Sequence, residues 1–173
     1  PKEDHPPALQ PLHREMANCL LYWGMRYPGI SILISKKDIS EAFKWIWLAL
    51  RDITLFAADI PGADFHVKGM ITAVYLVLTF GWTGSPGEWM VFAWVIKQYH
   101  EAHRPADEGW SDSVPFWNLF LMDDMVLVEP DIGTRPWESI RVAETGAVRA
   151  LGRGAINAKK DAEEGAMETY KLT

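Results

Sequence analysis

Cysteine and long hydrophobic runs are scarce in this chain of 173 residues. Its one cysteine, Cys19, forms neither an internal disulfide nor a zinc site, which favours a reducing compartment without choosing between cytoplasm and nucleus. The longest uncharged stretch, residues 69–87, is apolar only over residues 70–82 and is then interrupted by glycine and proline. A membrane-spanning helix needs about 20 apolar residues. We therefore expect no membrane association.

An excess of basic residues is also missing. Lysine and arginine number 17 against 23 aspartates and glutamates, which gives a formal net charge of −6. A free-standing nucleic-acid-binding domain usually has a basic surface, so this balance counts mildly against that class. Internal repeats and low-complexity segments are absent as well. The whole chain is 49% hydrophobic and 12% aromatic, with nine tryptophans, as expected for one globular domain with a substantial core.

Turn residues and hydrophobic spacing predict an alternation of helices and strands. We expect helices over residues 12–27, 40–51, 85–103 and 137–151, and strands over residues 30–34, 71–79, 114–122 and 125–128. Ser85 is the predicted N-cap of the third helix, with Pro86 at its first position and Glu88 completing a capping box. A partial helix is expected in the tail after Gly152. This order predicts an α+β domain, with helices packed on one face of an antiparallel sheet.

Three acidic residues are candidates for chemistry. Asp38 follows a hydrophobic strand, and Asp123 and Asp124 lie between two predicted strands. Taken singly, each is more typical of a helix cap or a solvated turn. Carboxylates fixed at strand ends are nevertheless the ligands that Mg²⁺ prefers, with substrate phosphates completing its shell. The sequence therefore leaves both interpretations open for each residue alone.

Three segments taken together resemble the catalytic motifs of the reverse transcriptase palm domain, the RNA-directed DNA polymerase of retrotransposons. The first is Asp38 followed by Ala42 and Phe43, the second is Phe80-Gly81-Trp82-Thr83-Gly84-Ser85-Pro86, and the third is Leu121-Met122-Asp123-Asp124. Their order and separations agree with the family, and the similarity spans roughly residues 30–165. One departure is plain, because Leu121 stands where the family usually has tyrosine.

The resemblance implies two-metal nucleotidyl transfer, in which a primer 3′-hydroxyl attacks a deoxynucleoside triphosphate on an RNA or DNA template. Asp38, Asp123 and Asp124 would be catalytic and, with the backbone carbonyl of Ile39, would hold two Mg²⁺ or Mn²⁺ ions. Phe43 would exclude the ribose 2′-hydroxyl. The substrate-binding residues implied by the resemblance are Ala42, Phe43, Phe80, Gly81, Trp82, Ser85 and Lys160. Lys159 and Lys160 lie about where the family has the lysine of a fourth motif, often proposed to protonate the leaving pyrophosphate.

The domain organisation implied by the resemblance is an incomplete one. Residues 1–29 would be a lead-in with partial fingers, and residues 30–173 the palm core of a larger polyprotein, without a thumb. The alternative is a catalytically inactive or truncated retroelement remnant that at most binds nucleic acid, which Leu121 and the short N-terminal region favour. A third possibility is an α+β domain with fortuitous matches. Under the simplest interpretation Phe43 is a core aromatic, and Lys159 and Lys160 are a solvated basic pair.

Overall fold

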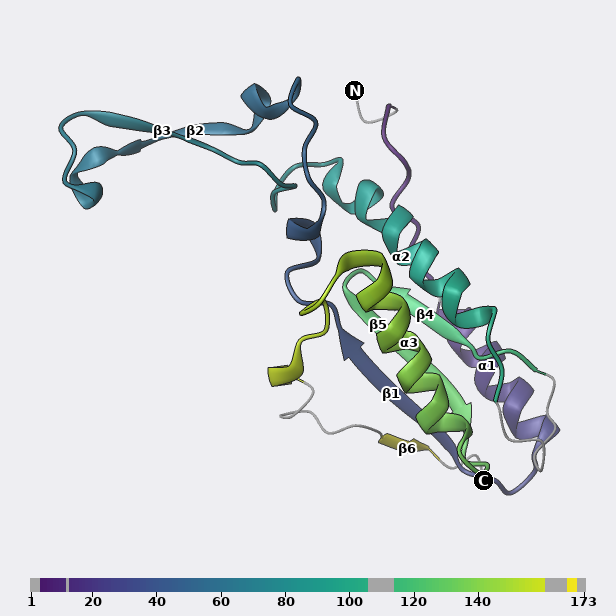
Figure 1. The fold of residues 1–173 in the computed structure, drawn as a ribbon. Helices are drawn as coiled ribbons and strands as arrows, with labels where there is room; N and C mark the ends of the chain where they lie inside the picture. The colour runs from purple at the N-terminus through teal and green to yellow at the C-terminus, as the bar shows by residue number, and fades with distance from the viewer. Residues whose placement is uncertain (1–3, 12, 106–113, 161–167, 171–173) are drawn as a thin grey trace.

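The computed structural model describes residues 4–11, 13–105, 114–160 and 168–170. Four strands form an antiparallel sheet in the order β4-β5-β1-β6, and two more form a separate ribbon (Figure 1). The sheet contains β1 (Ile32–Asp38), β4 (Asn118–Leu121), β5 (Asp124–Pro130) and β6 (Glu168–Tyr170); the ribbon contains β2 (Ala57–Pro61) and β3 (Met70–Val74). The helices are α1 (His13–Arg26), α2 (Ser85–Glu101) and α3 (Arg135–Leu151). The α+β class is confirmed.

Helices cover both faces of the sheet, so the expectation of helices on one face was wrong. Side chains alternate along β5, and Met125 and Leu127 pack in the core formed with α2 and α3. Val126 and Val128 point the other way and pack with Ile32 against α1. The core on the α1 side consists of Cys19, Trp23, Ile32, Val126 and Val128. Residues 13–26, assigned to a lead-in, therefore contribute to the same folded body as the sheet.

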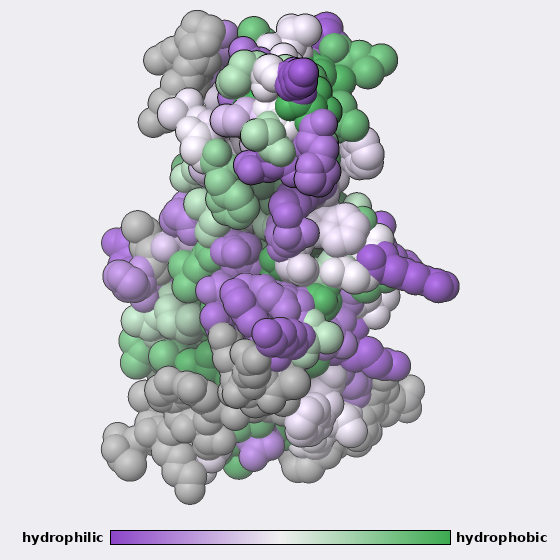
Figure 2. All heavy atoms as spheres, turned by 90° about the vertical axis from the view of Figure 1, so that its left-hand side faces the viewer, coloured by the Kyte–Doolittle hydropathy of each residue, from purple (hydrophilic) through white to green (hydrophobic). Residues whose placement is uncertain are grey.

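The ribbon of β2 and β3 projects away from the sheet, at the left of Figure 1. The strand expected over residues 71–79 is β3, which is shorter and pairs with β2, a strand that the sequence pattern did not predict. Several hydrophobic side chains are exposed on and beside this ribbon: Leu50, Leu55, Phe65, Met70 and Val74. Figure 2 views this side, where hydrophobic and hydrophilic side chains are interspersed.

The helix expected over residues 40–51 does not form, apart from a short 3₁₀-helix, Ala42–Trp45. Glu41 adopts a left-handed backbone conformation with φ 50°, which prevents a continuous helix from beginning at Ser40. Beyond it, Leu48 N–H donates to the carbonyl oxygen of Leu76 at 2.9 Å, and Leu78 N–H donates to that of Ile46 at 3.0 Å. Pairing with a distant segment thus replaced the local helix that hydrophobic spacing had favoured.

Helix α2 begins close to the predicted residue, but its N-cap is not the predicted one. Gly84 is the N-cap, and the Ser85 hydroxyl donates to the carbonyl oxygen of Thr79 at 2.7 Å. The predicted capping box between Ser85 and Glu88 was therefore wrong by one position. Ser85 instead fastens the helix to the segment that precedes the glycine-rich turn. Helices α1 and α3 closely match the predicted ranges.

After α3 the chain reverses at Gly152, which has φ 109°, and returns to the end of β1. The helix expected in the tail lies largely outside the described residues, which omit 161–167 and 171–173. Strand β6 was not expected, and it pairs with the first half of β1. In the described part of the chain, every helix is too short or too polar to cross a bilayer.

Candidate catalytic site at the end of strand β1

Two of the three predicted aspartates lie directly opposite each other across β1 and β5. The register of these strands pairs Asp38 with Asp124. The neighbouring Ile39 N–H donates to the carbonyl oxygen of Asp123 at 2.9 Å. Because the backbone bond joins the next residues along, Asp38 and Asp124 form a pair of the non-hydrogen-bonded type in this antiparallel ladder. In such a pair the two side chains leave the same face, with Cβ atoms about 5 Å apart. Residues separated by 86 positions are thereby brought together, as the first and third segments predicted.

The Asp38 carboxylate is almost fully buried, with 4% of the residue exposed, and each of its oxygens has a partner. Asn157 Nδ2 donates to Oδ2 at 2.8 Å. Lys160 Nζ donates to Oδ1 at 2.5 Å. This hydrogen bond is the main cause that raises the pKa of Lys160, with the charges of the aspartates adding to it. Lys160 is therefore protonated at neutral pH and neutralises Asp38.

Asp124 is partly exposed and pairs with a different lysine. Lys36 Nζ lies 3.3 Å from Asp124 Oδ1. Burial raises the pKa of the Asp124 carboxyl, Lys36 opposes that shift, and the charges of Asp123 and Asp38 add to it. Lys36 lies two residues before Asp38 on β1, and side chains repeat every two residues along a strand. It therefore shares the face that carries both aspartates.

The turn that carries Asp123 consists of Met122 and Asp123, between the antiparallel strands β4 and β5. Met122 has φ 58°, an uncommon conformation for a side chain of this kind. Both of its backbone polar groups are fixed. Trp89 Nε1 donates to its carbonyl oxygen at 2.7 Å, and its N–H donates to Gln10 Oε1 at 3.1 Å. Helix α2 and the N-terminal segment thus hold the turn from two sides.

The donor type suits a hard divalent cation, because Asp38 and Asp124 face each other across β1 and β5 and carboxylate oxygens are the ligands such a cation prefers. Their side chains are not gathered as a preformed metal cluster. Among the described residues, no group of three or more histidine, cysteine, aspartate or glutamate side chains is arranged to hold an ion. Lys160 and Lys36 supply the positive charge instead. A cation would have to compete with these two ion pairs.

The predicted substrate residues of the first segment are part of the core. Ala42 and Phe43 belong to the 3₁₀-helix and are buried, Phe43 with 7% exposed. The Phe43 ring lies edge-on to the Phe80 ring, with centroids 4.9 Å apart. Phe80 is largely exposed. The structure therefore joins the first and second segments through this aromatic pair, and it places Phe43 as a core residue.

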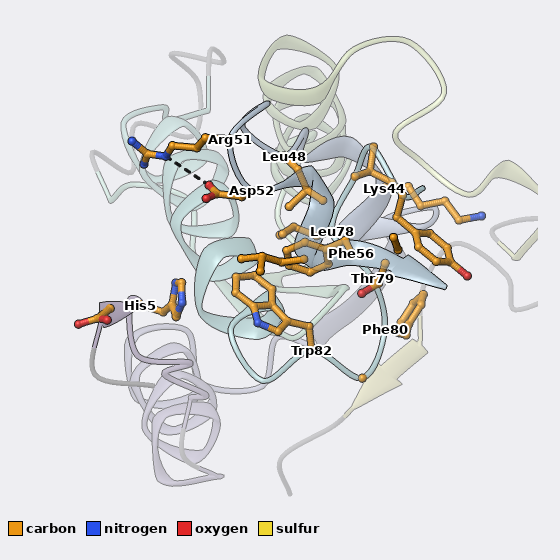
Figure 3. Close-up of a pocket in the computed structure, with 16 residues that line it drawn as sticks. His5, Lys44, Leu48, Arg51, Asp52, Phe56, Leu78, Thr79, Phe80 and Trp82 are labelled. Carbon is orange, nitrogen blue, oxygen red and sulfur yellow. Dashed lines mark ion pairs between the residues drawn. The ribbon is translucent and has the colours of Figure 1, made fainter. Parts of the chain in front are cut away.

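The second segment lines a cavity of about 1080 Å³. Phe80, Gly81 and Trp82 contribute to its wall, whereas none of the three aspartates does. Figure 3 shows Lys44 and Phe80 on one side of this cavity and His5 on the other. The lining also includes the cations Lys44 and Arg51. Phe56 and Tyr75 join Phe80 and Trp82 as its aromatic residues. The predicted site is thus divided between a carboxylate edge and an aromatic cavity.

Sequence reasoning missed the groups that hold the aspartates in place. Asn157 follows a glycine-rich reversal, where an asparagine signals a helix cap, but its 119-residue separation from Asp38 hides the contact. Lys36 could have been found from strand periodicity. Trp89 and Gln10 carry no local signal, because their partner is a backbone group of another segment.

A second polar cluster lies at the other end of β5 and is entirely buried. Arg135 Nε donates to Glu129 Oε2 at 2.5 Å, and Ser139 Oγ donates to Glu129 Oε1 at 3.2 Å. His100 Nε2 lies 2.9 Å from Ser139 Oγ, and Asn118 Nδ2 donates to His100 Nδ1 at 2.8 Å. Each of the five residues is at most 2% exposed, so no substrate reaches them. The cluster fastens α2 and α3 to the sheet.

Comparison with known proteins assigns no family. No protein-family model matches the chain, and no curated protein matches it.

Proposed function

We propose that this domain catalyses template-directed addition of deoxynucleotides to a primer, as the palm of a retroelement reverse transcriptase. One observation carries the proposal. The folded chain pairs Asp38 with Asp124 and hydrogen-bonds Ile39 to Asp123, so the first and third segments meet at one strand end. Fortuitous matches to the first and third motifs would not be expected to converge, because these two segments are far apart in the sequence.

The proposed roles of the residues are those that the resemblance to reverse transcriptases implies. Two Mg²⁺ ions, when bound, would neutralise phosphate charge and lower the pKa of the attacking hydroxyl. Asp38, Asp123 and Asp124 would hold them, with the backbone carbonyl of Ile39. Lys160 would donate a proton to the leaving pyrophosphate, and the position of its ammonium group beside Asp38 supports that role. In this scheme the protein contributes mainly positioning and charge.

The aromatic cavity supports the substrate side of the proposal. Aromatic faces stack on bases, and Lys44 and Arg51 supply positive charge beside them. Phe43 packs behind Phe80, so this pair would border the sugar of the incoming nucleotide. Templates would be RNA or DNA, and the domain would work within a larger polyprotein that supplies further nucleic-acid contacts.

The direct test is Mg²⁺- or Mn²⁺-dependent extension of a DNA primer on an RNA template. Asp123→Asn removes one carboxylate charge with little change of shape, and extension should fall by at least about 100-fold. The assay needs both this chain and a longer parent chain that includes it. Extension that survives in Asp123→Asn would exclude the proposed site.

A second candidate function is nucleic-acid binding without catalysis by a remnant of such an enzyme. Leu121 lacks the hydroxyl of the usual tyrosine, and Lys36 and Lys160 occupy the carboxylates. Primer–template binding that is unaffected by Asp123→Asn, with no extension by either chain, would favour this alternative.

A further inference from the structure

The chain segment after α3 forms a short extension of the sheet beside Asp38. Ser40 N–H donates to the carbonyl oxygen of Ala155 at 2.8 Å, and Asn157 N–H donates to that of Asp38 at 3.0 Å. Residues 155–157 therefore run antiparallel to the end of β1, on the side of β1 that does not pair with β5. These backbone bonds fix the position of Asn157 independently of its side chain.

The Asn157 side chain has only one orientation that satisfies its surroundings. Its Oδ1 accepts the backbone N–H of Lys160 at 3.4 Å, which caps the helical turn over residues 158–160. An N–H group must meet the oxygen end of the amide, so the nitrogen end faces Asp38. Nδ2 accordingly donates to Asp38 Oδ2 at 2.8 Å. The amide is anchored at both ends.

The two donors to Asp38 differ in how firmly they are held. Lys160 reaches Oδ1 at the end of a long, flexible stem, and its side chain is 46% exposed. A divalent cation on Oδ1 would replace this ammonium group without disturbing the backbone. Asn157 is short and is fixed by its own backbone bond, so it would remain on Oδ2. The orientation of the carboxylate thus depends on Asn157.

We propose that Asn157 is a positioning residue, which orients the Asp38 carboxylate so that Oδ1 is directed toward a divalent cation. The inference rests on the proposed function, because it assumes that Asp38 is a metal ligand. Groups that orient the ligands of a metal typically change its affinity by about 10- to 100-fold when removed. In a buried carboxylate, loss of this donor also leaves one oxygen without its partner.

The test measures Mn²⁺ binding to the purified chain by the electron paramagnetic resonance signal of the free ion. Asn157→Ser retains a good helix cap but shortens the side chain, so it separates orientation from folding. Asn157→His restores a ring N–H at a similar reach. Asn18→Ser makes the same chemical change at an exposed position on α1 and serves as the matched control. Asp38→Asn reports whether the ion binds at this site.

We expect Asn157→Ser to weaken Mn²⁺ binding by about 10- to 100-fold, while the chain stays folded with a melting temperature modestly below that of Asn18→Ser, because Asp38 Oδ2 loses its donor. Asn157→His should restore most of the affinity. Wild-type affinity in Asn157→Ser, with weakened binding in Asp38→Asn, would overturn the role of Asn157 alone. Binding unaffected by Asp38→Asn would overturn both this inference and the proposed function. Binding that depends on Asn157 without primer extension would remove only the proposed function.

Discussion

Trp89 donates its indole N–H to the carbonyl oxygen of Met122 at 2.7 Å, and this bond joins helix α2 to the turn that carries Asp123. Trp89 is fully buried, and the bond is partly buried. Met122 adopts a left-handed conformation that a methionine rarely takes. The tryptophan therefore supports a strained turn at the point where the proposed catalytic residues meet.

Trp89→Phe tests this support. Phenylalanine removes the donor and leaves a smaller side chain, so the Met122 carbonyl loses its partner and a small cavity opens. We expect the free energy of unfolding to fall by about 2–4 kcal/mol, measured by urea denaturation. Trp94→Phe on the exposed side of the same helix is the matched control and should change stability by less than about 0.5 kcal/mol. Equal effects of the two substitutions on stability would contradict the proposed support of the Met122 turn by Trp89.

Gly87→Ala tests the contact between α2 and the N-terminal segment. A Cβ at position 87 would lie 1.8 Å from the carbonyl oxygen of Pro6, so the segment must move. Alanine usually stabilises a helix interior by about 1 kcal/mol relative to glycine, whereas here we expect destabilisation and faster hydrogen exchange at Met122 N–H. In a chain that lacks residues 1–7, the same substitution should become stabilising. Stabilisation in the full chain would show that the contact is dispensable.

Phe43→Ala separates the core role of this ring from its proposed role in sugar selection. Loss of a buried phenylalanine costs about 3–5 kcal/mol of stability. If Phe43 also borders the nucleotide, incorporation of ribonucleotides should rise relative to deoxynucleotides. Phe65→Ala on the exposed ribbon is the control for stability. Primer extension with matched nucleotide pairs measures the selectivity, and an unchanged ratio would leave Phe43 as a core residue only.

The buried histidine of the second polar cluster should make the fold sensitive to acid. Burial lowers the pKa of His100 to about 3, from an ordinary value of 6.5, so the folded state disfavours the charged ring. Its contribution to stability is complete above pH 6.5 and is lost as the pH falls toward 3, by at most about 1.4 kcal/mol per pH unit. Burial also raises the pKa of Glu129 from 4.5 to about 7, which has the opposite effect as the pH falls through that interval.

The two effects partly cancel between pH 6.5 and 4.5. Below pH 4.5 only the His100 effect continues, so the free energy of unfolding should fall most steeply there. Urea unfolding at a series of pH values measures this slope. His100→Gln removes the titrating group and should flatten the slope, whereas His66→Gln, at an exposed position, should leave it unchanged. A slope that persists in His100→Gln would assign the acid sensitivity to other groups.

Prediction from sequence succeeded where local chemistry decided the outcome. Helices α1 and α3 and the strand that ends at Asp38 follow from hydrophobic periodicity and from the glycine and proline residues that bound them. The apolar residues on both sides of Asp123 and Asp124 likewise indicated two strands. These signals operate within about ten residues, so no distant contact is needed to interpret them.

Local pattern failed where a distant partner supplied the hydrogen bonds. Residues 46–48 have helical hydrophobic spacing, yet their backbone pairs with residues 76–78. The Ser85 hydroxyl was assigned to a cap and instead bonds Thr79. Strand β2 contains Ala, Asp and Pro, which have weak strand propensity, and β3 is what stabilises it.

The sequence by itself determined the α+β composition, the three acidic candidates and their positions at predicted strand ends. The tertiary structure alone decided the register that pairs Asp38 with Asp124, the contacts of Asn157 and Lys160 with the Asp38 carboxylate, and the position of α1 on the second face of the sheet. The reason is physical. Periodicity specifies which side of an element is apolar, but strand register and the partners of buried polar groups depend on contacts between residues up to 122 positions apart.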